Sequence, residues 1–598
     1  MAVAEQYYPP ARKGGCIVSA RKRFVAAGAA LLGIVGCLSQ PGAAADALNR
    51  AAPDAVPPSM PWWQHAVIYE VYPRSFADSD GDGTGDLNGV TAHLDYLRDL
   101  GVDAIWLTPF YPSPQVDFGY DISDYRDVDP RYGTLADFDR MVAEARKRNI
   151  RVLIDLVVNH TSDRHPWFTE SSSSATNPRA DWYVWHGAQP GSRPPNNWTS
   201  SFGGSAWQWV PQRQQYYFHH YYVQQPDLNW RNAEVRTAVA DILRFWLRRG
   251  VSGFRLDGIG NLYEDAALRD EPVLPGVNAL GDPNLSHIFT SNLAETHDAY
   301  RMLRRVVDEF PDTVLVGQVG ANSSAELAAA YGTADDELQL PINARFGSAA
   351  QLAAEEFRQR LRDAQTALNG HAPLLVLDSH DRPRSWTRFA DGVHDLAIAR
   401  LLATYLLAPR GAALVYYGQE LGMENNDPKR VEDVQDPVGR RGWPVNKGRD
   451  GERTPMQWTA GANAGFSTGG STWLPVAPGY AARNAEAESA ASDSLLNWYR
   501  ALIRLRRTNA GLRDGRYQAV DEAGADVVSW IATARGQSVL VALNFSAAPR
   551  TVAVDARAHG LRSARASTLL SSFGAPGSGA RLDPLTLPAY GAAVFAVR

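Results

Sequence analysis

The chain has 598 residues, of which 45% are apolar and 21% charged, a balance typical of a globular protein and not of a disordered or multi-span membrane protein. Its net charge is −6, and the main body has no long basic run, which argues against nucleic acid as a partner. The length exceeds the roughly 250 residues of an eight-stranded α/β barrel and leaves room for further domains.

The first 45 residues have the architecture of an export signal. Basic residues 21–23 precede an apolar stretch, 24–38, that is too short to span a bilayer comfortably. Two processing sites stay open: cleavage after the small residues 43–45, or a lipoprotein box that would place a lipid anchor on Cys37. Either one predicts a periplasmic or extracellular protein. Both cysteines lie in this leader, so we expect no disulfide in the mature chain, which would begin with a proline-rich linker at 46–60.

Short apolar, β-rich runs alternate with helical patterns from residue 66 onward. The runs are AVIYEVY, DAIWLT, RVLIDLVV, GFRLD, TVLVGQ, LQLPIN, PLLVLD and AALVYY. One of the intervening helices is predicted to begin at Thr134, because Asp137 follows three residues later as in a helix capping box. Buried strands that alternate with helices indicate a parallel sheet, and eight of them favour a closed (β/α)8 TIM barrel of the α/β class over a doubly wound sheet.

Two segments depart from this alternation. The long stretch 161–226, rich in Trp, Tyr, Ser, Pro and Asn, follows the third strand, and loops of that length are usually functional or folded in their own right. We therefore predict an inserted subdomain there, with the barrel formed by 61–160 and 227–509. Beyond residue 510, alternating runs such as DVVSWIATA predict a C-terminal antiparallel β domain, 510–598.

Polar residues follow several of the predicted strands, where a barrel carries its active site. They include the pair Asn159–His160, the pair Arg255 and Asp257, Gln318, and the pair His380–Asp381. Each residue alone has an ordinary structural explanation, such as a helix cap or a histidine bonded to a backbone carbonyl. Together they indicate one polar cluster, and a retaining glycosidase needs two carboxyl groups in such a cluster.

Five motifs carry a resemblance to a known family: GFRLD, NHTSD, SHDRPR, DFGYDISDY and GRDGERTPMQW. They resemble the signatures of the α-amylase superfamily, glycoside hydrolase family thirteen, and look closest to its α-glucosidase and oligo-1,6-glucosidase branch. The resemblance runs from about residue 62 to the C-terminus. It implies a barrel enzyme that removes the terminal glucose at the non-reducing end of short α-glucosides. The small Gly258 after the nucleophile position leans toward α-1,4 bonds.

The resemblance also implies roles for individual residues. Asp257 matches the nucleophile, Arg255 its orienting cation, and Asp381 the carboxylate that holds the sugar hydroxyls. The remaining expected substrate-binding residues are the hydrogen-bonding histidines His160 and His380, the aromatic platform Tyr120, and Asp117, which we expect to pair with Arg453.

Gln318 stands where the family has the glutamate that acts as general acid and base. An amide keeps the shape and can donate a hydrogen bond, but it has no proton to transfer, and loss of general acid catalysis costs roughly 10²- to 10⁴-fold. The next carboxylate, Glu326, is predicted on the following helix. Two origins stay open, an engineered substitution in a competent enzyme or a natural change. Two alternative functions also stay open, an inactive saccharide-binding family member and an α-glucosyl transferase.

The stretch DSDGDGTGD has carboxylates at alternate positions, the offsets of an EF-hand-like loop, although Gly89 stands where an EF-hand has its last glutamate. Clustered carboxylates repel one another unless a cation lies between them, and relatives in the branch carry a similar structural metal. We therefore expect structural Ca²⁺ or Mg²⁺ and no organic cofactor. The expected ligands are Asp78, Asp80, Asp82, Thr84 and Asp86. The expected partner is a small α-glucoside, and the sequence does not fix an oligomeric state.

Overall fold

The computed structural model describes residues 61–520, 524–574 and 578–598. The predicted leader and linker, 1–60, lie outside the described residues, and so do Cys16 and Cys37. Within the described ranges, no helix combines the length and the hydropathy that crossing a bilayer requires.

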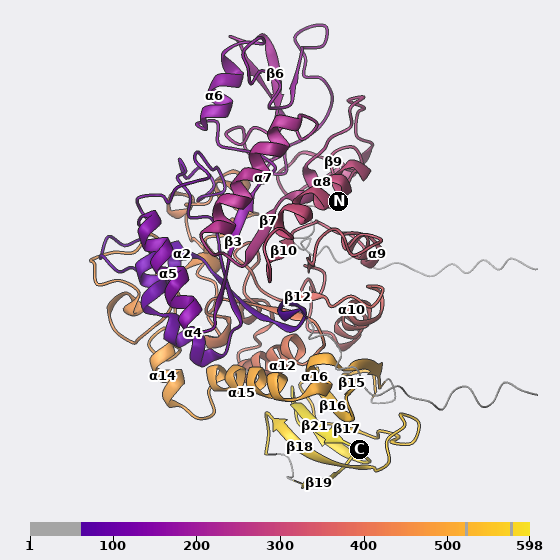
Figure 1. Cartoon of the computed structure of the whole chain (residues 1–598). Helices are drawn as coiled ribbons and strands as arrows, with labels where there is room; N and C mark the ends of the chain where they lie inside the picture. The colour runs from indigo at the N-terminus through magenta and orange to yellow at the C-terminus, as the bar shows by residue number, and fades with distance from the viewer. Residues whose placement is uncertain (1–60, 521–523, 575–577) are drawn as a thin grey trace, which may run out of the picture. The chain divides into compact units, whose positions relative to one another are not determined.

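Eight parallel strands close into a barrel, and each falls in one of the eight runs predicted from the sequence (Figure 1). Around the barrel they follow one another in chain order, which confirms the (β/α)8 fold. The strands are β1 (Val67–Val71), β2 (Ala104–Leu107), β3 (Arg151–Val157), β7 (Gly253–Asp257), β10 (Val314–Gly317), β11 (Leu340–Asn343), β12 (Leu374–Val376) and β13 (Ala412–Tyr416).

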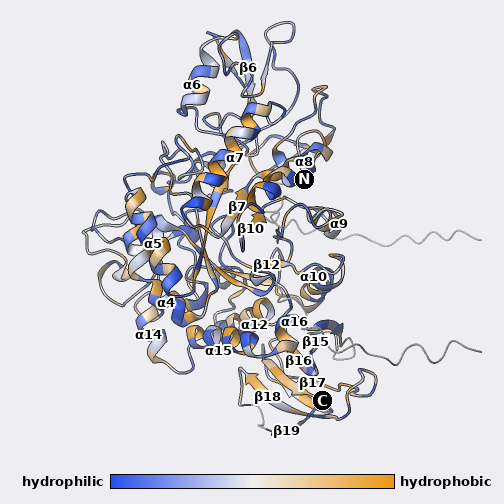
Figure 2. Ribbon diagram, viewed as in Figure 1, coloured by the Kyte–Doolittle hydropathy of each residue, from blue (hydrophilic) through white to orange (hydrophobic). Residues whose placement is uncertain are grey.

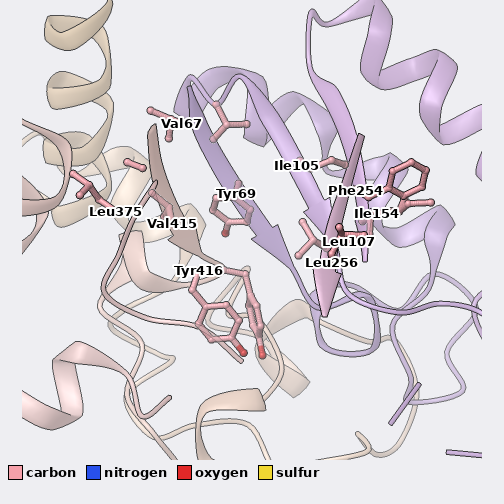
Figure 3. Packing of buried hydrophobic residues seen from close by; sticks show 14 of the residues in the cluster. Val67, Tyr69, Ile105, Leu107, Ile154, Phe254, Leu256, Leu375, Val415 and Tyr416 are labelled. Atoms are coloured by element: carbon pink, nitrogen blue, oxygen red, sulfur yellow. The ribbon is translucent and has the colours of Figure 1, made fainter. Parts of the chain in front are cut away.

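Side chains of the barrel strands alternate between two apolar cores. Ile68, Trp106 and Leu153 belong to the cluster that fills the barrel interior. Their strand neighbours, such as Tyr69 and Ile105, belong to the large outer cluster between strands and helices (Figure 3). This alternation explains why the strands read as continuous apolar runs, since both of their faces are buried.

Amphipathic helices cover the barrel, with hydrophilic residues toward solvent (Figure 2). They include α5 (Leu135–Lys147), α7 (Ala233–Arg248), α8 (Ala294–Val307), α10 (Ala354–Thr366) and α12 (Asp395–Leu407). The capping box predicted at Thr134 and Asp137 is confirmed at the start of α5. Shorter helices are α2 (Pro73–Phe76), α3 (Leu87–Ala92), α4 (Leu94–Leu100), α9 (Ser324–Ala329), α11 (Ser385–Phe389) and α13 (Pro437–Gly442).

The segment 161–226 contains helix α6 (Pro166–Ser173) and a three-stranded antiparallel sheet of β4 (Trp185–His186), β6 (Gln215–Phe218) and β5 (Trp207–Val210). Some of its buried aromatic side chains, Trp198, Trp207 and Phe218, belong to a separate apolar cluster, whereas others, such as Phe168 and Trp185, belong to the large outer cluster. A second excursion was not predicted. Between β7 and α8 the chain forms a hairpin of β8 (Val273–Val277) and β9 (Pro283–Leu285).

The C-terminal part begins with helices α14 (Ala485–Ala490), α15 (Leu495–Thr508) and α16 (Ala510–Asp514). Antiparallel strands follow, as predicted, in sheets of six and two strands. They are β14 (Arg516–Ala519), β15 (Val527–Ala534), β16 (Gln537–Asn544), β17 (Arg550–Val552), β18 (Arg565–Ser571), β19 (Ser578–Arg581), β20 (Leu585–Leu587) and β21 (Ala592–Val597). Phe545 after β16 packs against Phe357 of α10, with ring centroids 4.8 Å apart, so the sheet shares its core with the barrel helices.

Candidate active site

A cavity of about 130 Å³ opens at the carboxyl ends of the barrel strands. The strand ends bring Asp257, Gln318 and Asp381 to its wall, although these residues are far apart in the chain. Of the other predicted site residues, Asp117, Tyr120 and His160 also line it. The structure therefore gathers residues from five separate segments at the barrel mouth, the place where enzymes of this fold carry their chemistry.

Asp257, the last residue of β7, is held by the guanidinium of Arg255, two residues earlier on the same strand. Arg255 Nη1 lies 2.7 Å from Oδ1 of Asp257 and 2.9 Å from Oδ2 of Asp155 on β3. The Arg255 side chain is 2% exposed and lies over the ring of Trp106. Burial raises the pKa of Asp155 to about 7, with Arg255 opposing the shift. Burial raises the pKa of Asp257 as well, and the same cation pulls it back toward the ionised form.

Tyr120 and His380 form a stacked pair beside this cation, with ring centroids 5.5 Å apart and an interplanar angle of 12°. The Tyr120 hydroxyl donates to Oδ2 of Asp155 at 2.9 Å and lies 2.7 Å from Nε2 of His380. Nδ1 of His380 lies 2.5 Å from Oε1 of Glu70, a buried carboxylate on β1. Contacts at both ring nitrogens fix the orientation of the imidazole.

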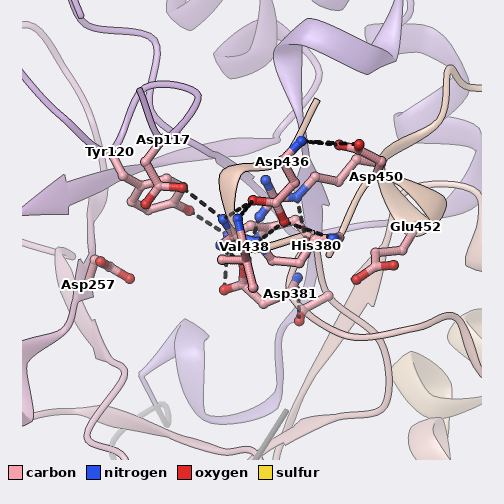
Figure 4. Close-up of polar contacts among 12 residues, drawn as sticks. Asp117, Tyr120, Asp257, His380, Asp381, Asp436, Val438, Asp450 and Glu452 are labelled. Atoms are coloured by element: carbon pink, nitrogen blue, oxygen red, sulfur yellow. Dashed lines mark hydrogen bonds and ion pairs between the residues drawn. The ribbon is translucent and has the colours of Figure 1, made fainter. Parts of the chain in front are cut away.

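A chain of ion pairs closes the inner end of the cavity (Figure 4). Arg449 donates to Asp117 Oδ1 at 2.8 Å, to Asp381 Oδ1 at 3.0 Å and to Asp436 Oδ2 at 2.8 Å. Arg453 donates to Asp381 Oδ1 at 2.9 Å. The predicted pairing of Asp117 with Arg453 is therefore wrong. The partner of Asp117 is Arg449, four residues earlier in the same motif, and Arg453 instead clamps Asp381 and the backbone carbonyl of His380.

The charges in this chain of ion pairs shift the pKa values of two of the cavity carboxylates, Asp381 and Asp117, in opposite directions. Burial raises the pKa of Asp381, but the charges of His380, Arg449 and Arg453 outweigh it and hold the pKa well below its ordinary range. Burial raises the pKa of Asp117 to about 6, against the opposing charge of Arg449. At neutral pH both are ionised, and Asp381 stays so far into the acid range.

His160 lies deep in the wall and is neutral. Its Nδ1 is 3.0 Å from Oδ1 of Asn159, and its Nε2 is 3.2 Å from the backbone oxygen of Tyr120. Burial lowers the pKa of His160 to about 3. A neutral imidazole in this place can exchange hydrogen bonds with a ligand hydroxyl without adding charge to the site.

Gln318 follows β10, and its backbone N–H donates to the Leu256 carbonyl at 3.1 Å, which sets it beside the end of β7. Its half-buried side chain lines the same cavity as Asp257 and Asp381. Glu326 lies on α9 as predicted, where its side chain accepts from the Asn322 N–H at 2.9 Å in the first turn of the helix. Among the described residues, the cavity wall contains three carboxylates, all aspartates, and none occupies the position of Gln318.

Several residues of the site were missed in the sequence. Asp155 and Glu70 could have been found, because each is a carboxylate within a buried apolar strand, and such a group must pair with a cation or hydrogen-bond donors. Arg449 lies in the motif GRDGERTPMQW, but the pairing with Asp117 was predicted for Arg453 of the same motif. The rest of the cavity wall could not be predicted from sequence patterns, because it comes from three loops distant in the chain. These contribute Ser201 and Phe202, residues 278–280 of the β8–β9 hairpin, and Val438 and Asn446 around α13.

The acidic loop before α3 brings together only part of the predicted metal ligands. Carboxylate oxygens of Asp78, Asp80 and Asp86 lie within 4.8 Å of one another. Asp82 is not in this group, and its side chain instead accepts from the Thr84 N–H at 2.7 Å. A backbone hydrogen bond from Asp82 lowers the pKa of the exposed Asp80, but a small loss of hydration and the charges of the neighbouring Asp82 and Asp86 outweigh it, so the pKa is raised.

Comparisons with known proteins agree with this geometry. The model of the α-amylase catalytic domain matches residues 70–515. A probable α-glucosidase of Rhizobium meliloti (strain 1021) is 43% identical over 491 residues, covering 80% of this chain and 88% of that protein. Maltase 1 of Drosophila virilis is 41% identical over 524 residues, covering 84% and 81%. The crystal structure of XgtA, an α-glucosyl transfer enzyme, matches with a TM-score of 0.82 at 39% identity, over 90% of this chain and 100% of that one. The chain therefore belongs to the α-amylase family of glycoside hydrolases, among its α-glucosidase-like members.

Proposed function

We propose that the protein forms a β-glucosyl ester on Asp257 from short α-glucosides and releases the glucosyl unit to water or to an alcohol. The single observation that carries this proposal is the Asp257 carboxylate, paired with Arg255 and facing a cavity whose inner end is closed by charged hydroxyl-binding groups. A cavity closed at one end suits the terminal glucose of a short substrate and not the middle of a long chain.

The reaction follows from the residues in place. Asp257 Oδ attacks the anomeric carbon while the bond from that carbon to the leaving oxygen breaks. Asp381 accepts hydrogen bonds from the sugar hydroxyls, Asp117 and Arg449 bind the far side of the ring, and Tyr120 and His380 pack beside it. The Gln318 amide can donate a hydrogen bond to the leaving oxygen but cannot protonate it, so a poor leaving group departs slowly.

Gly258 supports a preference for α-1,4 bonds. Its φ is +57°, and a Cβ at this position would lie 2.7 Å from the Tyr221 hydroxyl. Any larger side chain must therefore displace Tyr221, which itself lines the cavity where the second group of the substrate enters. Because Gly258 has no side chain, Tyr221 can stay against the cavity wall, whereas a bulky residue would force it to move.

The experiment that tests the proposal uses α-glucosyl fluoride, whose leaving group needs no protonation. Intact-protein mass spectrometry should detect an added glucosyl unit, and peptide mapping should place it on Asp257. The Asp257→Asn variant is the control and should stay unlabelled. If labelling is absent while maltose still binds, the protein is a saccharide-binding member of the family. That second candidate is favoured by one observation, the amide at position 318.

We predict that protonation of Asp117 causes a fall in kcat/KM on the acid side of the pH profile. Because its pKa is raised to about 6, this group loses its charge as the pH falls below that value and no longer attracts Arg449 or binds two hydroxyls as an anion. The kcat/KM for α-glucosyl fluoride should fall with a slope approaching about tenfold per pH unit below the apparent pKa. The kcat/KM of the Asp117→Asn variant should be lower than that of the native protein and should not fall further in this pH range. A limb that persists in the variant would assign it to another group.

We also propose that the loop around Asp80 binds structural Ca²⁺ or Mg²⁺. The donors fit a hard cation because three carboxylates converge, although Asp78 and Asp86 also accept backbone N–H groups of their own loop. Chelation by EDTA should lower the Tm by about 5 °C, and added Ca²⁺ should restore it. Asp80→Asn should remove the response, whereas the exposed control Asp124→Asn should keep it. An unchanged Tm in the native protein would contradict the proposal.

We propose that the protein is exported to the periplasm or the extracellular space, either by ordinary signal-peptide cleavage or with a lipid attached at Cys37. The support is the order of basic, apolar and small residues in the leader. Fractionation of cells that make the full chain, followed by the mass of the mature N-terminus, distinguishes ordinary cleavage from lipidation. A Cys37→Ser variant changes the fraction in which the protein is found only if the cysteine carries the lipid.

A further inference from the structure

The buried carboxylate of Glu70 has no part in the proposed reaction, yet it contacts a residue of the site. Glu70 lies on β1 among apolar and tyrosine neighbours, and it is 0% exposed. Its Oε1 accepts from the backbone N–H of His380 at 3.3 Å and lies 2.5 Å from Nδ1 of the same residue. Within the described part of the chain, Oε2 has no hydrogen-bond partner. A carboxylate buried in this way needs a cation beside it, and the His380 ring is placed to be that cation.

The contact with Glu70 fixes a proton on one nitrogen of the ring. An ionised carboxylate only accepts hydrogen bonds, so Nδ1 of His380 carries a proton. On the other side of the ring, Nε2 lies 2.7 Å from the Tyr120 hydroxyl and 3.3 Å from Oδ2 of Asp381. The same hydroxyl lies 2.9 Å from Oδ2 of Asp155. It has one proton for two acceptors, so the protonation of Nε2 is coupled to that of Asp155.

This chain of contacts can hold its last proton in two places. If the Tyr120 hydroxyl donates to Asp155, Nε2 of His380 must donate to the hydroxyl oxygen, and the ring is an imidazolium. If Asp155 carries the proton, it donates to the hydroxyl, which donates to a neutral ring. One state becomes the other when Nε2 gives its proton to the tyrosine oxygen and that oxygen gives its own to Asp155. The negative charge of Glu70 beside the ring favours the first state.

The charge of the ring matters for Asp381, whose two oxygens face different partners. Oδ1 accepts from Arg449 at 3.0 Å and from Arg453 at 2.9 Å. Oδ2 faces Nε2 of His380 (Figure 4). This second oxygen has a cationic partner only while the ring is protonated.

The position of the proton also matters for the nucleophile. Arg255 Nη1 lies 3.0 and 2.9 Å from the two oxygens of Asp155 and 2.7 Å from Oδ1 of Asp257, so one guanidinium serves two carboxylates. A proton on Asp155 would leave the guanidinium to Asp257 alone. The nucleophile would then be held more strongly by its counter-ion and would attack the anomeric carbon more slowly.

We propose that Glu70 is a positioning residue for glucosyl transfer: its charge holds the shared proton on His380. This inference rests on the proposed transfer to Asp257. Glu70 does not line the cavity and acts only through the ring. The other titratable and charged groups around this ring are Tyr72, Tyr120, Asp155, Asp257, Asp381, Arg255, Arg449 and Arg453.

The first test compares Glu70→Gln with the native chain on α-glucosyl fluoride between pH 5 and pH 8. Without the charge of Glu70, His380 should lose its proton near the ordinary histidine value of about 6.5. The ratio of variant to native kcat/KM should therefore be close to 1 at pH 5 and should fall about tenfold by pH 8, mostly through kcat. Taking the ratio cancels the acid-side fall assigned to Asp117.

Glu420→Gln is the matched control, because Glu420 is also 0% exposed. Its Oε1 accepts from the hydroxyls of Tyr69 at 2.8 Å and Tyr96 at 2.6 Å, and its Oε2 has no hydrogen-bond partner among the described residues. Its two partners are tyrosines and not a histidine, so the ratio for this variant should be the same at every pH even if the substitution lowers stability. A ratio that is independent of pH for Glu70→Gln as well overturns the inference.

A measurement on the native chain does not depend on whether the variant folds. NMR of protein labelled with 15N in its histidine rings should show both nitrogens of His380 protonated at pH 8, with the signals assigned by their loss in His380→Gln. A neutral ring at pH 8 overturns the inference, whatever the activity. If the ring is charged but fluoride fails to label Asp257, the proposed function is overturned and the role of Glu70 falls with it, so the two failures are told apart.

Discussion

Gln318→Glu should raise the turnover of maltose by roughly 10²- to 10⁴-fold. The side chain at this position shares the cavity wall with Asp257 and Asp381, so a glutamate there would be a partly buried carboxyl close to two other carboxylates. Both influences raise a carboxyl pKa, which would keep the new group protonated near neutral pH and able to protonate the leaving oxygen. Initial rates of glucose release by the two chains, at matched concentration and pH, measure the effect.

The pH profile gives an independent check on this substitution. The Gln318→Glu chain should gain an alkaline limb, because its activity requires the protonated acid, whereas the native chain has no such group to lose. Glu326→Gln is the control, because it removes the next carboxylate along the chain after position 318. It should leave the rate of glucose release unchanged, since the Glu326 side chain lies in the first turn of α9. If neither chain consumes maltose while both fold and bind it, the protein is a binder.

Arg449→Leu should destabilise the fold by about 3–5 kcal/mol, the usual cost of removing one partner from buried ion pairs. The side chain of Arg449 is 9% exposed and neutralises Asp117, Asp381 and Asp436, the last of which is fully buried. The measurement is the free energy of unfolding from urea denaturation monitored by tryptophan fluorescence. Arg430→Leu is the control: this arginine pairs with Asp433 at the surface with 69% of its side chain exposed, and should cost less than about 1 kcal/mol.

The pH dependence of the Arg449→Leu deficit follows from the same pairs. Burial raises the pKa of Asp436, but Arg449 outweighs it and keeps the pKa below the ordinary value, so this pair stabilises the native protein above the unfolded pKa near 4. The stabilisation is lost as the pH falls through the folded pKa. The deficit of the variant should therefore be fully present at neutral pH and shrink only below about pH 4. A deficit that does not change with pH would point to lost packing of the arginine stem in place of lost charge.

Local sequence patterns were sufficient to predict the eight strands of the barrel. Each of its strands is a continuous apolar run because both faces of a barrel strand are buried, and that burial is visible in the residues themselves. The β8–β9 hairpin escaped prediction because its first strand, VLPGV, contains a proline and a glycine and is largely exposed, so it has neither the composition nor the alternation of a strand.

The candidate site was predictable as far as it depends on strand ends. Asp257, Gln318 and Asp381 follow strands of one barrel, and a barrel places all such ends at one mouth. The partner of Asp117 was not predictable, because Arg449 and Arg453 lie four residues apart in one motif. Which of them reaches Asp117 is decided by the fold of the intervening turn, and that turn is packed by residues distant in the chain.

The sequence by itself determined the family, the barrel and the amide at position 318, since these depend on residue identity and on short-range periodicity. Only the tertiary structure decided how the charges pair around Asp381 and what forms the outer wall of the cavity. The wall comes from three loops that are far apart in sequence and meet at Asp282, and contacts between such loops depend on the geometry of the whole barrel. The residues proposed to act at the anomeric carbon were therefore identifiable from the chain, whereas the pairing of the charges around them was visible only in the folded molecule.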